Sequence, residues 1–367
     1  MKKAQVNTIY WIRTISCLSV VVIHVLGNTY SQFNGIYKNV FLSNIVDILK
    51  VLIMFATPTF VFISEFLVSK SYQEIPKGFI KKRFQILFIP YLIWGIFFAL
   101  DYHIKQGTIL DYKLVISSLF SNVVLGYFID YFILIILQFN ILHIILDKYL
   151  RRWSAKYVLI IGLIINLSYL AFFNFTEPYN IPLGNYIWDW GYWLPFIGWL
   201  FYFLLGYYCG IYYEEFIQLL NKYRKLVLFL PLFTLGFGIG VAFLDLYNIS
   251  SKRVDNVFYT TSIIFLIFLI SKDTVKVPKI VLFISNYSFS IYLLHGIFIN
   301  RFSNIVYFKQ INIIAYAFCL FILSVVGSIL LSYFINKFSW GRYIVGRITR
   351  KKRNFKSDQP YLKSISK

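Results

Sequence analysis

The sequence predicts an all-α, polytopic membrane protein with about ten transmembrane helices and both termini in the cytoplasm. Hydrophobic residues occupy 59% of the 367 positions, whereas charged residues occupy only 14%. A typical soluble domain is about half apolar and about a quarter charged. The apolar residues form long runs along the whole chain, and the mean hydropathy is +0.68. We therefore expect a multi-pass protein of the cell membrane.

The individual spans follow from these runs, because a helix needs about 20 mostly apolar residues to cross a bilayer. The first run is too long for a signal peptide and contains Arg13, so we expect a retained helix. The segment 117–125 is too short to cross and is expected to be re-entrant or interfacial. The predicted spans are Thr8–Asn28, Ser43–Val68, Phe84–Leu100, Gly126–Leu146, Tyr157–Phe173, Gly191–Tyr213, Leu226–Tyr247, a shorter Val257–Ile270, Val281–Asn300 and Ile311–Asn336.

Basic residues set the orientation of these spans. With the N-terminus in the cytoplasm, 28 of the 36 lysines and arginines fall on the cytoplasmic side. Such an excess is typical of cytoplasmic loops. The net charge of +21 therefore indicates topology and contact with membrane lipid, and no nucleic-acid partner is expected. The other eight basic residues are Lys38, Lys50, Lys105, Lys113, Lys252, Arg253, Arg301 and Lys309.

The spans predict one transmembrane domain over residues 1–340, followed by a basic cytoplasmic tail over residues 341–367. Such a tail is expected to lie on anionic lipid, where each charge contributes about 1 kcal/mol. The three cysteines, Cys17, Cys209 and Cys319, lie far apart inside apolar runs. Their spacing is not that of a metal site. We expect neither a metal ion nor a tightly bound cofactor.

The first span, with the stretch "RTISCLSVVVIH", carries two ionisable side chains in an otherwise uncharged segment. Arg13 and His24 are eleven residues apart, which on a helix is three turns plus roughly 20°, or about 16 Å along the axis. Both side chains therefore lie on one face. Arginine binds phosphate, and histidine exchanges protons near neutral pH. The alternative is that Arg13 extends to the inner surface and His24 merely lies at the outer interface.

An Arg, ten residues and a His in the first span resemble the signature of the family-three membrane acyltransferases. The stretch "SFSIYLLHGIFI" resembles that family's late helix motif and places Ser288, Tyr292 and His295 on it. His295 falls late in a span that runs outward, so we expect it in the same half of the membrane as His24. A bundle-facing histidine bonded to a hydroxyl is the alternative.

Two further stretches extend the resemblance. "TPTFVFISEFL" is similar to the family's second-span motif, with Ser64 retained and Glu65 in place of a glycine. "KKRFQILFIPYLIWG" is similar to the basic entry to the third span, where Lys82 and Arg83 stand and Leu87 replaces a second arginine. "GWLFYFLLGYYCG" and "GYFIDYFILIILQFNIL" resemble a staphylococcal branch described either as exporting poly-N-acetylglucosamine or as O-succinylating it.

The resemblance implies an O-acyltransferase that moves an acetyl or succinyl group from a cytoplasmic thioester, acyl-CoA, to a hydroxyl of a cell-surface polysaccharide. Arg13, Arg83 and Lys82 would bind the donor, and His24 would act as general base. Asp130, one turn into the fourth predicted span, is a candidate for orienting an imidazole. A solvated residue at the mouth of the site is the alternative for Asp130.

Two other classes of function remain open. The chain could export a poly-N-acetylglucosamine-type polysaccharide involved in biofilm formation, although the sequence shows no acidic stripe, no pair of interrupted helices and no ATP motif. It could also be a structural partner of a polysaccharide synthase. An enzyme would leave acylated glycan, an exporter would leave glycan outside the cell, and a scaffold would change only the amounts.

Overall fold

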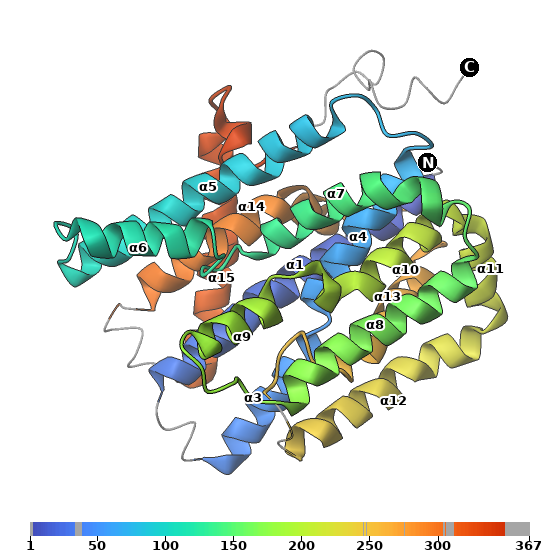
Figure 1. Cartoon of the computed structure of the whole chain (residues 1–367), viewed down its shortest axis with the longest axis horizontal. Coiled ribbons are helices and arrows are strands. Elements are labelled where there is room, and N and C mark those ends of the chain that lie inside the picture. The colour runs from blue at the N-terminus through green and yellow to red at the C-terminus, as the bar shows by residue number, and fades with distance from the viewer. Residues whose placement is uncertain are drawn as a thin grey trace.

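A computed structural model describes residues 3–33, 39–244, 246, 248–274, 276–303, 305 and 312–348. Over this part the regular elements are all helical, which confirms the predicted all-α class. Most of the helices run roughly side by side, whereas α15 crosses them steeply (Figure 1). They are α1 (Lys3–Gln32), α3 (Val40–Ile53), α4 (Ala56–Ser71), α5 (Phe79–Gln106), α6 (Tyr112–Val123), α7 (Phe132–Leu150), α8 (Ala155–Phe175), α9 (Gly184–Trp193), α10 (Leu200–Ile211), α11 (Tyr213–Lys222), α12 (Arg224–Phe243), α13 (Asn256–Ser271), α14 (Lys279–Phe302) and α15 (Ile313–Ile335).

The number of crossings agrees with the prediction. Among the described residues, nine helices or helix pairs are long and apolar enough to cross a membrane. The tenth predicted span is α13, which is apolar but shorter at 16 residues. Its brevity agrees with the short run at 257–270. The protein is therefore a multi-pass membrane protein.

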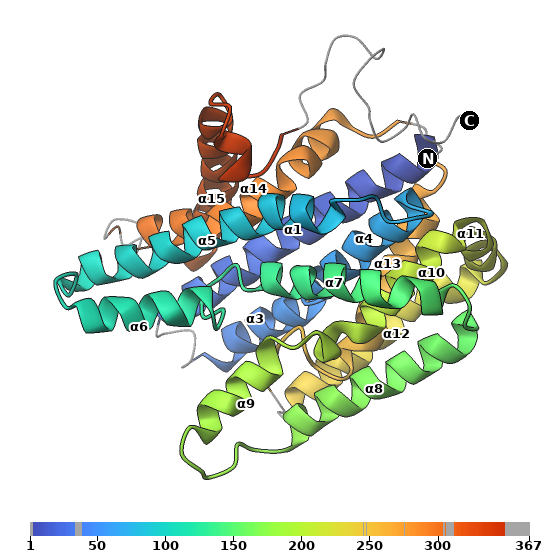
Figure 2. The same cartoon turned by 45° about the horizontal axis from the view of Figure 1, so that its top comes forward.

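Contacts between α1, α14 and α15 define the two ends of the bundle. The hydroxyl of Thr14 donates to the carbonyl of Val281 at 2.9 Å, so α14 begins beside the early part of α1. The hydroxyl of Tyr316 donates to Asn28 at 2.8 Å, so α15 begins beside the late part of α1. We call the end where α1 begins the N-terminal end and the opposite end the far end; Figure 2 shows both from a second direction.

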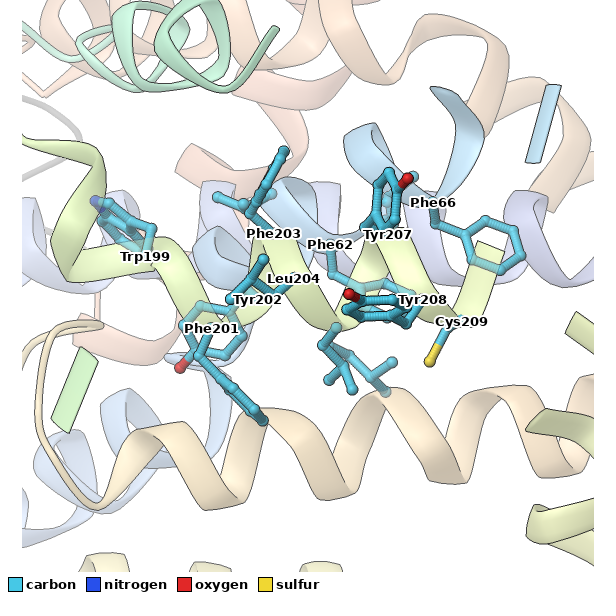
Figure 3. Packing of buried hydrophobic residues seen from close by; sticks show 14 of the residues in the cluster. Phe62, Phe66, Trp199, Phe201, Tyr202, Phe203, Leu204, Tyr207, Tyr208 and Cys209 are labelled. Carbon is cyan, nitrogen blue, oxygen red and sulfur yellow. The ribbon is translucent and has the colours of Figure 1, made fainter. Parts of the chain in front are cut away.

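The core is built around α10, which is buried along almost its whole length. Figure 3 shows its aromatic side chains packed with Phe62 and Phe66 of α4. A Cβ at Gly206 would lie 2.5 Å from the carbonyl oxygen of Phe62, and a Cβ at Gly210 would lie 2.0 Å from the hydroxyl of Ser69. Small residues spaced by four are the usual device for close helix contact in membranes. The stretch "GYYCG" thus sets the distance between α4 and α10.

Two breaks in the helical chain lie near each other. The first separates α6 from α7, which is long enough to cross by itself. The second is a 3-10 turn between α9 and α10, which cross as a pair, as α3 and α4 do, and it falls inside the span predicted as continuous over Gly191–Tyr213. Gly126 has a φ of +72° in the first interruption, and Pro195 begins the second. At 12 residues, or about 18 Å, α6 is too short to cross alone, so it takes the place of the predicted re-entrant segment.

The two interruptions pack against each other. The rings of Tyr131 and Trp193 lie 5.7 Å apart, edge to face. The side-chain amide of Gln138 donates to the carbonyl of Leu194 at 3.0 Å and accepts from the N–H of Phe196 at 3.1 Å. Backbone groups freed at membrane depth need such partners. One glutamine on α7 therefore satisfies the interruption between α9 and α10.

The first residues of the predicted cytoplasmic tail are packed against the bundle. The hydroxyl of Ser290 donates to the carbonyl of Val345 at 2.5 Å, and the indole of Trp94 donates to that of Ile344 at 2.9 Å. Val345 is fully buried. The segment after α15 thus joins α5 to α14. Residues 349–367 of the predicted tail lie outside the described residues.

Candidate functional site

Arg13 and His24 lie on one uninterrupted helix, α1. The eleven-residue spacing therefore holds in the structure and separates the two positions by about 16 Å along the axis. Arg13 lies toward the N-terminal end, and His24 lies toward the far end. Both side chains are half-buried.

His24 lies against His295 of α14. The two ring centroids are 5.0 Å apart and the planes are tilted by 45°. The nearest protein partners of the His295 Nδ1 are the carbonyl oxygens of Tyr292 and Ile291, at 2.7 and 3.1 Å. Carbonyl oxygens only accept, so Nδ1 carries the hydrogen and Nε2 carries the lone pair. Within the part of the chain that the structure describes, Nε2 is buried with no hydrogen-bond partner.

The two histidines differ in access. His295 is fully buried, whereas His24 is half-buried and has no hydrogen-bond partner among the described residues. The pair therefore offers one imidazole that a substrate can reach and a second that the bundle holds. The alternative predicted for His295, a hydrogen bond to a hydroxyl, is not what the structure shows, because its Nδ1 donates to the backbone.

The guanidinium of Arg13 is not paired with another side chain of the described residues. Over the described ranges it has neither an ion pair nor a hydrogen bond, and its ionisable neighbours are Tyr10 and Cys17. A half-buried guanidinium without a protein partner retains all five donors. Such a group is suited to an anionic ligand entering between the helices.

Arg83 and Lys82 lie in the first turns of α5, and Arg83 is half-buried while Lys82 is exposed. The guanidinium of Arg83 lies 5.1 Å from the ring centroid of Phe79 and interacts electrostatically with Glu65 of α4. The structure thus places Arg83 beside a carboxylate, a neighbour that the sequence had not assigned to it.

Glu65 and His143 form a contact that sequence reasoning missed. The Oε1 of Glu65 and the Nδ1 of His143 are 2.5 Å apart, and both side chains are almost completely buried. The Nε2 of His143 lies 4.0 Å from Asp147, which also accepts from Tyr207 at 2.8 Å. The signal was available: Glu65 stands where the family has glycine, and His143 precedes Asp147 by one helical turn.

Asp130 lies in the turn before α7, outside the membrane-spanning helices. It is fully buried, and neither carboxyl oxygen has a hydrogen-bond partner among the described residues. Burial raises the pKa of this carboxyl well above its usual range. Tyr91 and Tyr292 are its electrostatic neighbours. The predicted role of Asp130 in orienting an imidazole therefore stays a prediction.

The motif residues support the contact between α1 and α14. Ser288 is buried, and its carbonyl accepts from the thiol of Cys17 on α1 at 3.4 Å. The hydroxyl of Tyr292 donates to the carbonyl of Ile129 at 3.5 Å, and its ring centroid lies 6.1 Å from that of His295. Ser64 is half-buried on α4. Among the described residues, no three His, Cys, Asp or Glu side chains gather as a metal site.

Comparison with known proteins connects this arrangement to a family. The chain is 39% identical over 352 residues to a protein of Bacillus subtilis (strain 168) named "Putative membrane-bound acyltransferase YfiQ", with 95% of this chain and 96% of that protein covered. It is 28% identical over 360 residues to a Staphylococcus aureus (strain MRSA252) protein named "Probable poly-beta-1,6-N-acetyl-D-glucosamine export protein", with 93% and 97% covered. A Staphylococcus epidermidis protein of the same name is 29% identical over 319 residues, with 82% of each chain covered.

No solved structure matches the chain. The model of the acyltransferase domain of the acyltransferase 3 family matches residues 6–333, a range that contains the two histidines, Arg13 and the breaks at Gly126 and Pro195. The protein therefore belongs to the acyltransferase 3 family of membrane proteins.

Proposed function

We propose that the protein transfers an acyl group, acetyl or succinyl, from cytoplasmic acyl-CoA to a hydroxyl of a cell-surface polysaccharide. Membership of the acyltransferase 3 family supports acyl transfer, and the export-named staphylococcal relatives support a role with a polysaccharide. The observation that carries the proposal is the contact between His24 and His295. His24 in turn shares one face of α1 with Arg13.

In the proposed step, the Nε2 or Nδ1 of His24 accepts the proton of the acceptor hydroxyl as the oxygen attacks the thioester carbonyl. The carbon–oxygen bond forms, the carbon–sulfur bond breaks, and the thiolate leaves. The proton on the imidazole then passes to the thiolate, so the products are an ester and free coenzyme A. His295 packs against His24 and holds its ring at the site.

The acyl-CoA donor would bind beside the N-terminal half of α1. Arg13, Arg83 and Lys82 lie toward the N-terminal end, where they would bind the phosphates of the donor. The separation of about 16 Å between Arg13 and His24 suits the long pantetheine arm that joins the nucleotide to the thioester. This orientation requires the N-terminal end in the cytoplasm, as the distribution of basic residues predicts. No tightly bound cofactor is needed.

Export of the polysaccharide is the second candidate function, and the names of the staphylococcal relatives favour it. Discontinuous helices that meet inside a bundle are common at the binding sites of transporters. The interruptions at Gly126 and Pro195 pack together through Tyr131 and Trp193. They are equally suited to an enzyme whose substrates meet inside the membrane, so they do not separate the two candidates.

The test uses purified full-length protein in lipid nanodiscs, radiolabelled acetyl-CoA or succinyl-CoA, and an oligosaccharide of β-1,6-linked N-acetylglucosamine. An acyltransferase forms a labelled, alkali-labile ester on the oligosaccharide. Failure of both donors with this acceptor and with extracted surface polysaccharide would leave export as the better candidate. Co-purification with a polysaccharide synthase, which we also propose as a partner, is measured separately.

A further inference from the structure

A cavity of about 550 Å³ opens at the far end of the bundle. It is formed by the last turns of α5, by α6, by the interruption between α6 and α7, and by α14. Its volume falls within the range of about 300–1,000 Å³ that is usual for small-molecule sites.

The lining combines aromatic rings with uncharged polar groups. Tyr102 and Tyr127 are exposed at the cavity, and Ser121 and Asn122 of α6 supply a hydroxyl and an amide. One N–H of the Asn122 amide donates to the carbonyl of Gly95 at 3.2 Å, which fixes the side chain. Its second N–H and its oxygen keep hydrogen-bonding capacity.

The charged side chains at the cavity are paired, with one carboxylate between two cations. The carboxylate of Asp101 pairs with Lys105 at 2.8 Å and also with Arg301. The lysine and the arginine are therefore engaged with a carboxylate rather than presented to a phosphate. Such a lining favours a neutral, hydroxyl-rich ligand whose ring faces can lie on tyrosine.

The cavity reaches the residue that follows His295 on α14. Gly296, which directly follows His295, lines it, and a Cβ there would lie 3.0 Å from Ile129 and 3.4 Å from Phe98. The irregular segment 127–129 forms another wall. The cavity is therefore bordered by irregular chain before α7 as well as by helices.

We propose that this cavity binds sugar units of the acceptor polysaccharide and presents their hydroxyls toward the histidine pair. The proposal rests on the proposed function for the fate of the sugar, but not for its binding. Tyr102 and Tyr127 stack on the sugar faces, and Ser121, Asn122 and Asp101 accept or donate hydrogen bonds to its hydroxyl and amide groups.

The test measures binding of a β-1,6-linked N-acetylglucosamine tetrasaccharide to the purified full chain by calorimetry, with no donor present. Ser121→Trp fills the cavity, and Ser117→Trp places the same ring on an exposed position of α6 outside it. We expect at least a tenfold rise in Kd for Ser121→Trp and less than a twofold change for Ser117→Trp. Equal effects of the two substitutions, or no binding by the wild-type chain, would overturn the proposal.

A second pair of substitutions, which remove a ring instead of adding one, tests the proposal if a tryptophan prevents folding. Tyr127→Ala removes a ring from the cavity, and Tyr112→Ala removes an exposed ring from the start of α6 outside it. We expect about a fivefold loss of affinity only for Tyr127→Ala, which corresponds to about 1 kcal/mol. Because no donor is present, this measurement is independent of acyl transfer. Binding that depends on the cavity, together with failure of both donors in the transfer assay, would refute the proposed reaction and leave the sugar site standing.

Discussion

The Nδ1 of His143 on α7 and the Oε1 of Glu65 on α4 lie 2.5 Å apart, and both side chains are almost completely buried. Glu65 is only 3% exposed and contacts α7, whereas the ammonium of Lys70 on the same helix lies 4.7 Å from the ring centroid of Tyr213. A buried carboxylate and imidazole thus join two crossings of the bundle.

Removing one partner of this contact should destabilise the protein more than removing both. His143→Leu leaves a buried carboxylate with Asp147 and Arg83 as its remaining charged neighbours, and the loss is expected to be about 3–5 kcal/mol. Glu65→Leu combined with His143→Leu should recover part of that loss. Thermal unfolding in detergent of the wild type, both single variants and the double variant measures the coupling. Strictly additive effects would show that the contact contributes nothing.

The close approach of α4 and α10 predicts a sharp difference between two glycines. Gly206→Ala places a Cβ 2.5 Å from the backbone carbonyl of Phe62, which cannot rotate away. Overpacking of this kind costs about 1–3 kcal/mol. Gly236→Ala on α12 is the matched control, since no atom lies within 4 Å of its Cβ. Thermal stability and the yield of monodisperse protein should fall only for Gly206→Ala, and similar behaviour of both variants would contradict the packing.

The uneven distribution of basic residues predicts the topology. A reporter fused after residue 367 should be cytoplasmic, and a reporter inserted near Asn180, between α8 and α9, should be extracytoplasmic. Paired alkaline phosphatase and green fluorescent protein fusions report the two sides. Both reporters on the same side of the membrane would refute the arrangement of ten crossings.

If Arg13 binds the donor phosphates, donor affinity should fall further as a substitution removes more of its hydrogen-bonding capacity. Arg13→Lys retains the charge without the planar fork and should keep part of the donor affinity. Arg13→Ala should lose about ten- to a hundredfold, as expected for charge-assisted hydrogen bonds of about 1.5–3 kcal/mol. Binding of a non-hydrolysable thioether analogue of acetyl-CoA measures this, with exposed Lys113→Ala at the far end as the control. Unchanged affinity in Arg13→Ala would leave Arg13 as a side chain that extends to the membrane surface.

Much of the fold follows from periodicity and composition alone. The apolar runs predict the crossings, because a bilayer demands uninterrupted apolar length, and α13 is as short as its run. The spacing of Arg13 and His24 predicts one face, because α1 has no break. The break at Pro195 escaped prediction, because Pro195 stands inside an apolar run that predicts one continuous span over Gly191–Tyr213. The break at Gly126 falls at the predicted boundary between the segment 117–125 and the span Gly126–Leu146.

Pairings between distant segments were also beyond the sequence. Lys252 reads as a loop charge, yet it is fully buried and its Nζ donates to the carbonyls of Tyr192 and Trp193, the latter at 2.7 Å. Arg253 is buried beside Asp255 at 2.8 Å. Hydropathy predicts how deep in the membrane a residue lies, but not which residues it contacts. The side-chain partners could therefore be identified only from the three-dimensional structure.

The central claim is that His24 accepts the proton of the acceptor hydroxyl, and one substitution tests it most directly. His24→Gln keeps polarity and similar size, and loss of a general base lowers the rate by about 10² to 10⁴. Gly27→Ala, one turn further along α1 with no atom within 4 Å, is the matched control. Ester content and location of the surface polysaccharide are quantified in the same cells. We predict unacylated polysaccharide outside His24→Gln cells and normal esters in Gly27→Ala cells; normal ester content with normal export in His24→Gln cells would contradict the catalytic role of His24.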